Sequence, residues 1–165
     1  MRSADWPEVA RIYLEGIESG HATFETEVPS WERWDAGHLP FARLVISVED
    51  AIAGWAALSR VSAREAYSGV AEVSVYVSSE MRGQGLGYAL LEALVRESEL
   101  KGIWTLQASI FPENRASIRL HQQCGFREVG QRERIAQLGG IWRDTVLLER
   151  RSTIAGTEAK ELIRN

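Results

Sequence analysis

The stretch Arg82-Gly83-Gln84-Gly85-Leu86-Gly87 constrains the fold of this chain more than any other segment. An apolar, β-rich segment, 73–77, precedes it, and a helical segment, 88–100, follows it. Three glycines at alternate positions let the backbone pass close to a ligand, and the start of a helix adds a partial positive charge. This arrangement predicts a pyrophosphate cradle built mainly from main chain, with Arg82 as an additional cation.

The spacing of the glycines distinguishes this stretch from two common phosphate-binding motifs. A dinucleotide-binding fold has G-x-G-x-x-G after its first strand, and a P-loop ends in G-K-[ST]. Here the pattern is G-x-G-x-G in mid-chain, followed by Tyr88-Ala89. It resembles the Q/R-x-x-G-x-G/A signature of the GNAT superfamily of N-acetyltransferases, which holds the pyrophosphate of coenzyme A. The resemblance implies that acetyl-CoA is bound by Arg82, Gly83, Gln84, Gly85, Leu86, Gly87 and Tyr88. The alternative is a glycine-rich turn without a ligand.

Composition and charge disfavour several other classes of protein. A chain of 165 residues with 45% hydrophobic and 25% charged residues suits one soluble domain with a sizeable core. The net charge of −4 provides no basic field for nucleic acid or an anionic membrane. The single cysteine, Cys124, excludes an internal disulfide, and no metal-ligand constellation is evident. Because neither a long apolar run nor a signal-peptide pattern occurs, we expect a cytoplasmic protein.

The hydrophobic pattern predicts a single α+β domain, a GNAT-like layered fold with a mixed, mostly antiparallel sheet flanked by helices. Helices are expected from Asp5 as N-cap, from Ser30 as N-cap, over 88–100, and over 117–123 with Gly125 as the stop. Strands are expected at 43–48 and 52–59, at 71–77 and 104–110, and at 126–134 and 142–148 with a turn near Gly139-Gly140.

The predicted domain spans residues 1–150. Residues 151–165 lack a clear apolar stripe and are expected to form an appended tail, frayed or weakly helical. The resemblance implies a strand before the first helix, but only residues 1–4 precede Asp5. That strand is therefore expected to be rudimentary or truncated.

Further segments resemble one group of the superfamily, the acetyltransferases of phosphinothricin, methionine sulfoximine and related amino acids. The matching segments are Phe24-Glu25-Thr26, Arg64-Glu65-Ala66-Tyr67, Glu72-Val73-Ser74-Val75-Tyr76-Val77, Asn114-Arg115-Ala116-Ser117-Ile118-Arg119-Leu120-His121, Gly125-Phe126 and Trp142-Arg143-Asp144. The resemblance implies an enzyme that moves the acetyl group of acetyl-CoA to the amino group of a small amino-acid-like acceptor. It also implies a homodimer and a link to antibiotic or herbicide resistance.

Glu72 is the candidate general base, because the acceptor amine is mostly protonated at neutral pH and must lose a proton before it attacks the thioester. Alternation along the strand puts Glu72 and Tyr76 on one face and Val75 and Val77 on the other. A carboxylate among apolar neighbours is suited to taking a proton directly or through water. The family's catalytic glutamate matches this position. The alternative is a solvated glutamate on a strand.

Two further segments are expected to contact the cofactor. In the superfamily this strand splays from its neighbour, so the backbone of Val75, Tyr76 and Val77 would pair with the pantetheine arm. The amide of Val75 or Tyr76 would then donate to the oxyanion; ordinary sheet pairing is the alternative. Asn114 is interpreted as a contact to pantetheine near the sulfur, as a helix N-cap, or as both. Ser117 is expected to reach the cofactor in the same way.

His121 stands where many GNAT enzymes have a tyrosine that protonates the departing thiolate, and the related group often has histidine there. Imidazole suits this role because its pKa lies near neutrality. The alternative is a packed or capping histidine late in a short helix. Cys124 is interpreted as a small core residue rather than as a nucleophile.

The acceptor pocket is expected between two segments. Arg64 and Tyr67 border it in the related enzymes, and an arginine can hold a carboxylate, phosphinate or arsinate through two hydrogen bonds. Phe24, Glu25 and Thr26 would form the opposite wall, with Glu25 available to an ammonium group. The alternative for Arg64 is a solvated charge in a hairpin.

Two other functions stay open at this point. One is acetylation of protein N-termini, lysines or polyamines, which needs an open groove or a strongly acidic patch. The other is a regulatory domain that binds coenzyme A without catalysis. The presence of Glu72 beside an intact glycine stretch disfavours this second function.

Overall fold

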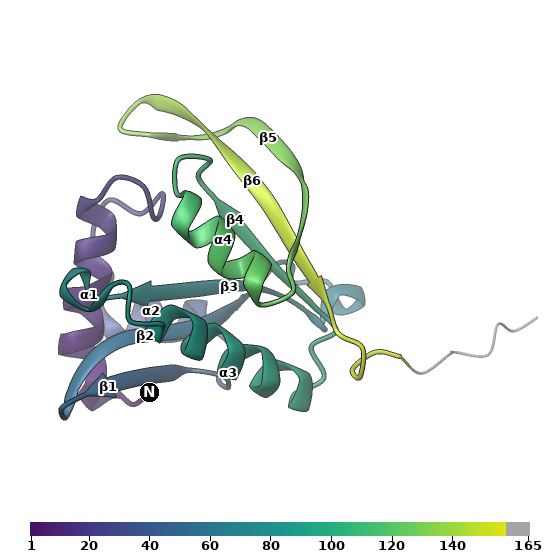
Figure 1. The fold of residues 1–165 in the computed structure, drawn as a ribbon. Coiled ribbons are helices and arrows are strands. Elements are labelled where there is room, and N and C mark those ends of the chain that lie inside the picture. The colour runs from purple at the N-terminus through teal and green to yellow at the C-terminus, as the bar shows by residue number, and fades with distance from the viewer. Residues whose placement is uncertain (158–165) are drawn as a thin grey trace, which may run out of the picture.

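A six-stranded sheet lies at the centre of the computed structural model, which describes residues 1–157 (Figure 1). Its strands are β1 (Leu44–Val48), β2 (Ala51–Arg60), β3 (Val70–Val77), β4 (Thr105–Ile110), β5 (Arg127–Leu138) and β6 (Ile141–Arg151). The helices are α1 (Trp6–Glu18), α2 (Trp31–Gly37), α3 (Leu86–Leu100) and α4 (Arg115–Gln123), with 3₁₀ turns at η1 (Ser3–Asp5), η2 (Glu65–Tyr67) and η3 (Ser79–Met81). No helix in this part of the chain is both long and apolar enough to cross a membrane.

The strand order is β1-β2-β3-β4-β6-β5, and β3 and β4 separate in the middle of the sheet. All other neighbours are antiparallel, whereas β3 and β4 run parallel and pair only between residues 70–72 and 105–107. Glu72 lies opposite Gln107 at the last paired position. Beyond Glu72, β3 continues along β2 to Val77 without β4 on its other side. The mixed sheet confirms the predicted fold class, and the separation confirms the predicted splay.

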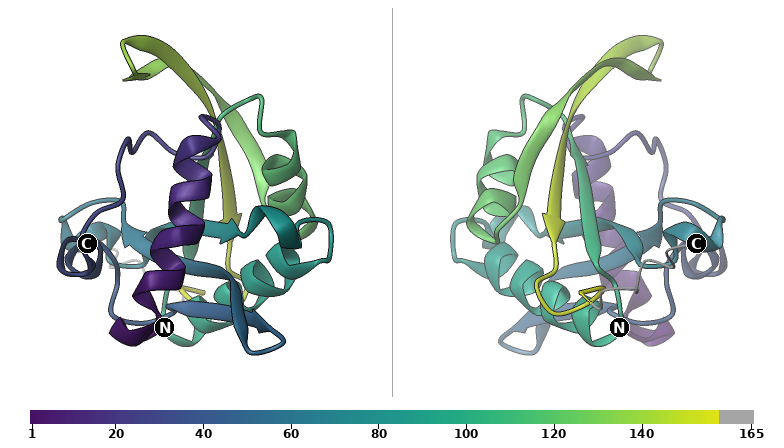
Figure 2. Two further views of the ribbon diagram at one scale, coloured as in Figure 1. Left: turned by 90° about the vertical axis from the view of Figure 1, so that its left-hand side faces the viewer. Right: turned by 90° about the vertical axis from the view of Figure 1, so that its right-hand side faces the viewer.

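Helices cover both faces of the sheet, with α1 and α2 on one side and α3 and α4 on the other (Figure 2). On the first side, Val9 and Ile12 of α1 pack with the fully buried Trp55 of β2. On the second side, the leucines of α3 pack against the sheet in the larger core. Val75 packs against this larger core and Tyr76 against the α1 side, which confirms the predicted alternation along β3.

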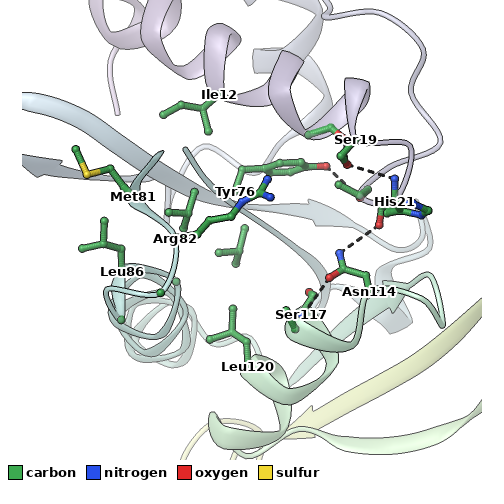
Figure 3. Close-up of a pocket in the computed structure, with 18 of the residues that line it drawn as sticks. Ile12, Ser19, His21, Tyr76, Met81, Arg82, Leu86, Asn114, Ser117 and Leu120 are labelled. Carbon is green, nitrogen blue, oxygen red and sulfur yellow. Dashed lines mark hydrogen bonds between the residues drawn. The ribbon is translucent and has the colours of Figure 1, made fainter. Parts of the chain in front are cut away.

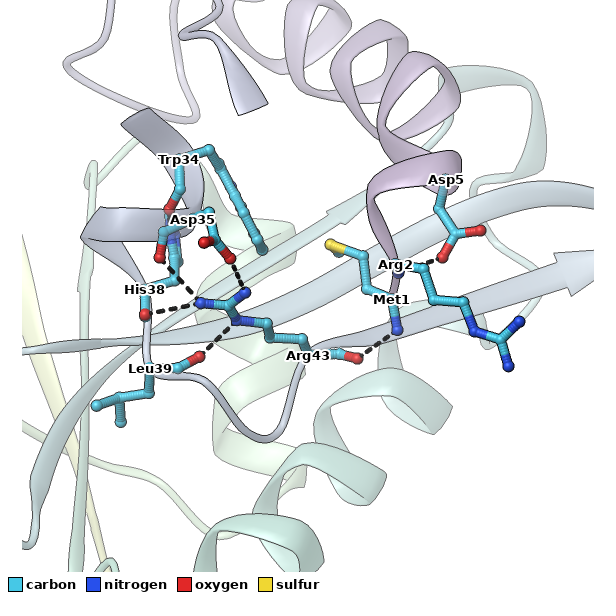
Figure 4. A network of polar contacts seen from close by, with 8 residues as sticks. All are labelled: Met1, Arg2, Asp5, Trp34, Asp35, His38, Leu39 and Arg43. Carbon is cyan, nitrogen blue, oxygen red and sulfur yellow. Dashed lines mark hydrogen bonds and ion pairs between the residues drawn. The ribbon is translucent and has the colours of Figure 1, made fainter. Parts of the chain in front are cut away.

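The N-terminus is tied to the loop that precedes β1 (Figure 4). The Met1 amino group donates to the Arg43 carbonyl at 2.8 Å. The Arg43 guanidinium in turn donates to the main-chain carbonyls of Asp35, His38 and Leu39 and forms an ion pair with Asp35. These bonds fix the connection between α2 and the sheet. Within residues 1–157, no strand precedes α1.

Several predicted helix ends are confirmed and three are corrected, among them the start of α4, which lies at Arg115 rather than Ser117. Ser30 caps α2 by accepting the Arg33 N–H, and Gly125 has a φ of 85° after α4, as predicted. Asp5 does not cap α1, because its carboxylate instead accepts the N–H of Arg2 at 2.6 Å. Helix α3 begins two residues earlier than predicted, at Leu86, since the glycine turn itself leads into the helix.

The segment after β6 starts as part of the fold. Ser152 is buried; its N–H donates to the Trp104 carbonyl at 2.9 Å, and its hydroxyl donates to Glu99 of α3 at 2.9 Å. The predicted tail is therefore anchored where it begins. The rest of that prediction concerns residues 158–165, which lie outside the described residues.

The β5–β6 hairpin is longer than predicted and projects beyond the rest of the fold (Figures 1 and 2). Its turn lies at Gly139-Gly140, as expected, where both glycines have positive φ. Strand β5 forms the sheet edge and contains an irregularity between Arg132 and Ala136. Here the N–H of Arg134 donates to Asp144 at 2.8 Å.

Candidate active site

The glycine stretch forms a turn at the N-terminus of α3. Gly83 and Gly85 have φ values of 77° and 78°, in the left-handed region that other residues rarely adopt. A Cβ on either glycine would meet no atom within 4 Å, so backbone conformation rather than crowding requires glycine here. Gly85 is the residue before α3 and provides no side-chain cap. The first N–H groups of α3 are therefore available to an anion, and the helix dipole favours one.

A cavity of about 490 Å³ extends from this helix end along β3 to the start of α4 (Figure 3). Arg82 and Gly85 line one end, Val75 lines the middle, and Asn114 and Ser117 line the other end. The unpaired edge of β3 thus faces a space that leads away from the anion-binding turn. We call this space the large cavity.

Two of the predicted cofactor residues do not line the large cavity. The Gln84 side chain turns to the sulfur of Met81, at 3.5 Å, and Tyr88 is exposed on α3. The other ten line it, namely Val75, Tyr76, Val77, Arg82, Gly83, Gly85, Leu86, Gly87, Asn114 and Ser117.

A second cavity of about 240 Å³, the small cavity, adjoins the first. Its walls contain the predicted base Glu72, the predicted acceptor residues Phe24 and Glu25, and the predicted acid His121. Thr26 is not among the residues that line it. The residues that line both cavities are His21, Ala22, Val75, Tyr76, Asn114 and Ser117. The two cavities therefore meet beside the splayed part of β3.

The segment His21-Ala22 crosses this junction and is held from both sides (Figure 3). The Asn114 amide donates to the His21 carbonyl at 3.2 Å, while its oxygen accepts the Ser117 N–H at 3.1 Å. The Tyr76 hydroxyl donates to the Ala22 carbonyl at 3.5 Å. Asn114 is thus an N-cap and also positions the segment above the junction. Sequence analysis placed His21 and Ala22 in a polar loop and interpreted His21 as a surface or loop residue, so it did not assign either to the site; a signal for them was their closeness to the matching segment 24–26.

Glu72 is the point at which β3 leaves β4. It is half-buried and lines the small cavity, and its carboxylate has no hydrogen-bond or ion-pair partner within residues 1–157. Its register partner Gln107 lies on β4, and Ser109, two residues further along the same face, also lines the small cavity. The carboxylate is thus available to a ligand in the small cavity.

His121 is buried, and its surroundings favour the neutral imidazole. Its side chain is 4% exposed, and Nδ1 lies 2.8 Å from the Ser117 carbonyl, one helical turn earlier. Because a carbonyl only accepts, Nδ1 carries the proton and Nε2 keeps a free lone pair. Nε2 is buried and lacks a partner in the described part of the chain. Burial lowers the pKa of His121 below the ordinary imidazole value.

Arg64 and Tyr67 lie apart from the small cavity. Arg64 precedes the short turn η2 and Tyr67 ends it, and both line a separate hollow together with Thr105 and Gln107 of β4. The Arg64 guanidinium lies 5.9 Å from the centre of the Tyr67 ring. Phe24, from the other predicted wall, instead packs against Phe111 with ring centres 4.8 Å apart. The structure therefore does not bring the two predicted walls together.

Cys124 lines neither cavity. It is half-buried at the end of α4 and packs against the larger core. Burial raises the pKa of its thiol, which disfavours the nucleophilic thiolate. This environment agrees with the interpretation of Cys124 as a core residue.

Comparison with known proteins identifies the family. Residues 6–126 match the sequence profile described as the Acetyltransferase (GNAT) family. The chain belongs to this family. It is therefore an acetyltransferase, with the uncapped helix end and splayed strand described above.

Two curated relatives in the family match most of the chain. The phosphinothricin N-acetyltransferase of Alcaligenes faecalis is 35% identical over 161 residues, which cover 91% of this chain and 79% of that protein. The L-methionine sulfoximine/L-methionine sulfone acetyltransferase of Pseudomonas aeruginosa is 32% identical over 152 residues, which cover 88% of each chain.

Two solved structures have nearly the same fold. A phosphinothricin acetyltransferase from Sinorhizobium meliloti in complex with acetyl-CoA has a TM-score of 0.84 at 30% identity, and the match covers 96% of this chain and 89% of that one. A ribosomal-protein-alanine N-acetyltransferase from Brucella melitensis also has a TM-score of 0.84 at 30% identity, over 92% of this chain and 97% of that one. The fold alone therefore does not distinguish between small and protein acceptors.

Proposed function

We propose that this enzyme transfers the acetyl group of acetyl-CoA to the primary amine of a small amino-acid-like acceptor such as phosphinothricin or methionine sulfoximine. The observation that carries the proposal is the junction of the two cavities beside the splayed part of β3. One cavity begins at an anion-binding helix end and the other contains a free carboxylate. This arrangement suits a long anionic donor and a small amine that meet at one carbonyl carbon.

The large cavity has the features that coenzyme A requires. The pyrophosphate is assigned to the N–H groups at the start of α3, with Arg82 beside them. The pantetheine amides are assigned to the edge of β3 that β4 leaves free, where they add to the sheet as another strand does. The thioester then lies at the junction, near Asn114 and Ser117.

Glu72 is assigned as the general base. It takes a proton from the acceptor ammonium, directly or through water, and the free amine attacks the thioester carbonyl. A C–N bond forms and the C–S bond breaks, while negative charge develops on the carbonyl oxygen. A main-chain N–H of Val75 or Tyr76 is assigned as the donor to that oxygen.

The tautomer of His121 limits its part in the reaction. With Nδ1 engaged by the Ser117 carbonyl, Nε2 has no proton to give to the thiolate. We therefore assign protonation of the thiolate to water, or to His121 only after its Nε2 has taken a proton from the acceptor. This assignment modifies the role as an acid that the resemblance implies.

An acceptor panel tests the proposal. Release of free thiol from acetyl-CoA is measured with phosphinothricin, methionine sulfoximine, a polyamine, and peptides with free N-termini. Turnover with the first two, well above that with peptides, supports a small amino-acid acceptor. Preference for a peptide that begins with alanine would instead support a function like that named for the Brucella melitensis protein. No turnover with any amine would refute the proposal.

A further inference from the structure

No lysine or arginine of residues 1–157 lines the small cavity, although the proposed acceptors carry an acidic group. Its lining residues include two carboxylates, Glu25 and Glu72, and no lysine or arginine. Two negative charges suit an ammonium group but repel a carboxylate or phosphinate. An acceptor with both groups therefore needs a positive charge close behind one wall.

Arg132 of β5 provides such a charge. Its Nη2 donates to Ser109 Oγ at 2.7 Å, and its Nε donates to Thr145 Oγ1 at 3.2 Å. The side chain thus crosses β6, where Thr145 is its register partner, and reaches β4. Ser109 and Glu72 both line the small cavity. The Arg132 guanidinium contacts Ser109 and is therefore separated from the cavity by this one side chain.

The charge of Arg132 is not neutralised within the described residues. Six ion pairs occur in residues 1–157, and none includes Arg132. Its two hydrogen-bond partners are neutral hydroxyl groups, and a guanidinium has five N–H donors. Most of its donor capacity therefore remains for an anion.

We propose that Arg132 and Ser109 form the subsite for the acidic group of the acceptor. Since Ser109 Oγ accepts from Arg132, its own proton is free to be donated to a carboxylate or phosphinate oxygen in the small cavity. Arg132 polarises this hydroxyl and compensates the charge of the acidic group. The same cavity then holds the ammonium end near Glu72. This inference rests on the proposed function and specifies its substrate class.

The test compares two acceptors that differ only in charge. KM and kcat are measured for L-methionine sulfoximine and for the matching carboxamide, which keeps the amine but lacks the negative charge. We expect Arg132→Met to raise the KM for the acid by roughly 10- to 150-fold, as for loss of a charge-assisted hydrogen bond, and to leave the KM for the carboxamide within about threefold. Arg132→Lys should recover part of the loss. Ser109→Ala should also raise the ratio of the KM for the acid to the KM for the carboxamide.

Arg127→Met is the matched control, because it removes one positive charge from the same strand. Arg127 pairs with Glu149 on the exposed surface and lines neither cavity, so both KM values should stay near wild type. Equal losses for acid and carboxamide in Arg132→Met, or an unchanged ratio, would overturn the inference. If Arg132→Met does not fold in a thermal unfolding measurement, the ratio in Ser109→Ala decides. A wild-type enzyme that acetylates no amine would instead refute the proposed function itself.

Discussion

The two cavities that meet at β3 are built in different ways. The large cavity takes nine of its nineteen lining residues from one continuous stretch, β3 through the start of α3, where main-chain N–H groups at the helix end are uncapped. The small cavity takes side chains from the loop after α1, from β3, from β4 and from α4. The first depends on local backbone conformation, whereas the second depends on the order of strands in the sheet. Mutations should therefore affect them in different ways.

Glu72→Gln tests the chemistry of the small cavity and should have the largest effect. The amide keeps the shape of the side chain but cannot accept the ammonium proton. We expect kcat to fall by roughly 10²–10⁴-fold at neutral pH, while binding of acetyl-CoA in the large cavity stays near wild type. The loss should shrink at high pH, where more of the acceptor amine is already free. Steady-state kinetics across pH check this, and wild-type turnover at pH 7 would exclude Glu72 as the base.

Gly85→Val tests the backbone of the large cavity. A β-branched residue is strained at a φ of 78°, although nothing would collide with its Cβ. The turn should rearrange, and the affinity for acetyl-CoA should fall at least about tenfold, or about 1.4 kcal/mol. Titration calorimetry measures this loss.

Gly102→Val is the matched control for Gly85→Val. Gly102 has nearly the same φ, 79°, and equally open surroundings at the far end of α3, but it lines neither cavity. Both variants should therefore lose similar thermal stability, and only Gly85→Val should lose affinity. Equal affinities in the two variants would show that the left-handed turn is not part of the cofactor site.

The difference between the cavities also explains which features could be predicted from the sequence and which could not. Gly83 and Gly85, the alternation on β3 and the Ser30 cap depend on neighbours within a few residues, and all three were predicted. Ser109 lines the small cavity, and Arg132 contacts Ser109, only because β4, β6 and β5 lie side by side beyond β3. No spacing in the sequence indicates that order. Arg64 illustrates the reverse, because it precedes the strand of Glu72 in sequence but lies in another hollow.

His121 and His38 should have a smaller effect, on how the stability of the fold depends on pH. Burial lowers the pKa of both, so the folded protein disfavours their protonated forms while the unfolded chain takes up a proton near the ordinary pKa of about 6.5. The stability that depends on neutral histidine is therefore present above about pH 6.5 and is lost as pH falls below it. Each group contributes at most about 1.4 kcal/mol per pH unit.

Substitution separates the two histidines. His121→Gln and His38→Gln should each reduce the loss of stability between about pH 7 and pH 5, measured by chemical unfolding. Only His121 lines the small cavity, so only His121→Gln should also change kcat. If His38→Gln lowers kcat as well, the effect of His121 would be one of folding rather than of chemistry.

Arg64→Ala should have the smallest effect on the acceptor. The resemblance placed Arg64 at the acceptor pocket, and loss of a contact to the acidic group there would raise the acceptor KM strongly. In the structure its guanidinium lies beside the exposed Tyr67 in a separate hollow, so we expect the KM for methionine sulfoximine to change less than about threefold. A rise of tenfold or more, confined to acceptors with an acidic group, would mean that the acceptor reaches from Glu72 past Gln107 into that hollow. The small cavity would then be only part of the acceptor site. The acceptor site would also include the turn η2, and so would be assembled from even more separate segments than the small cavity alone.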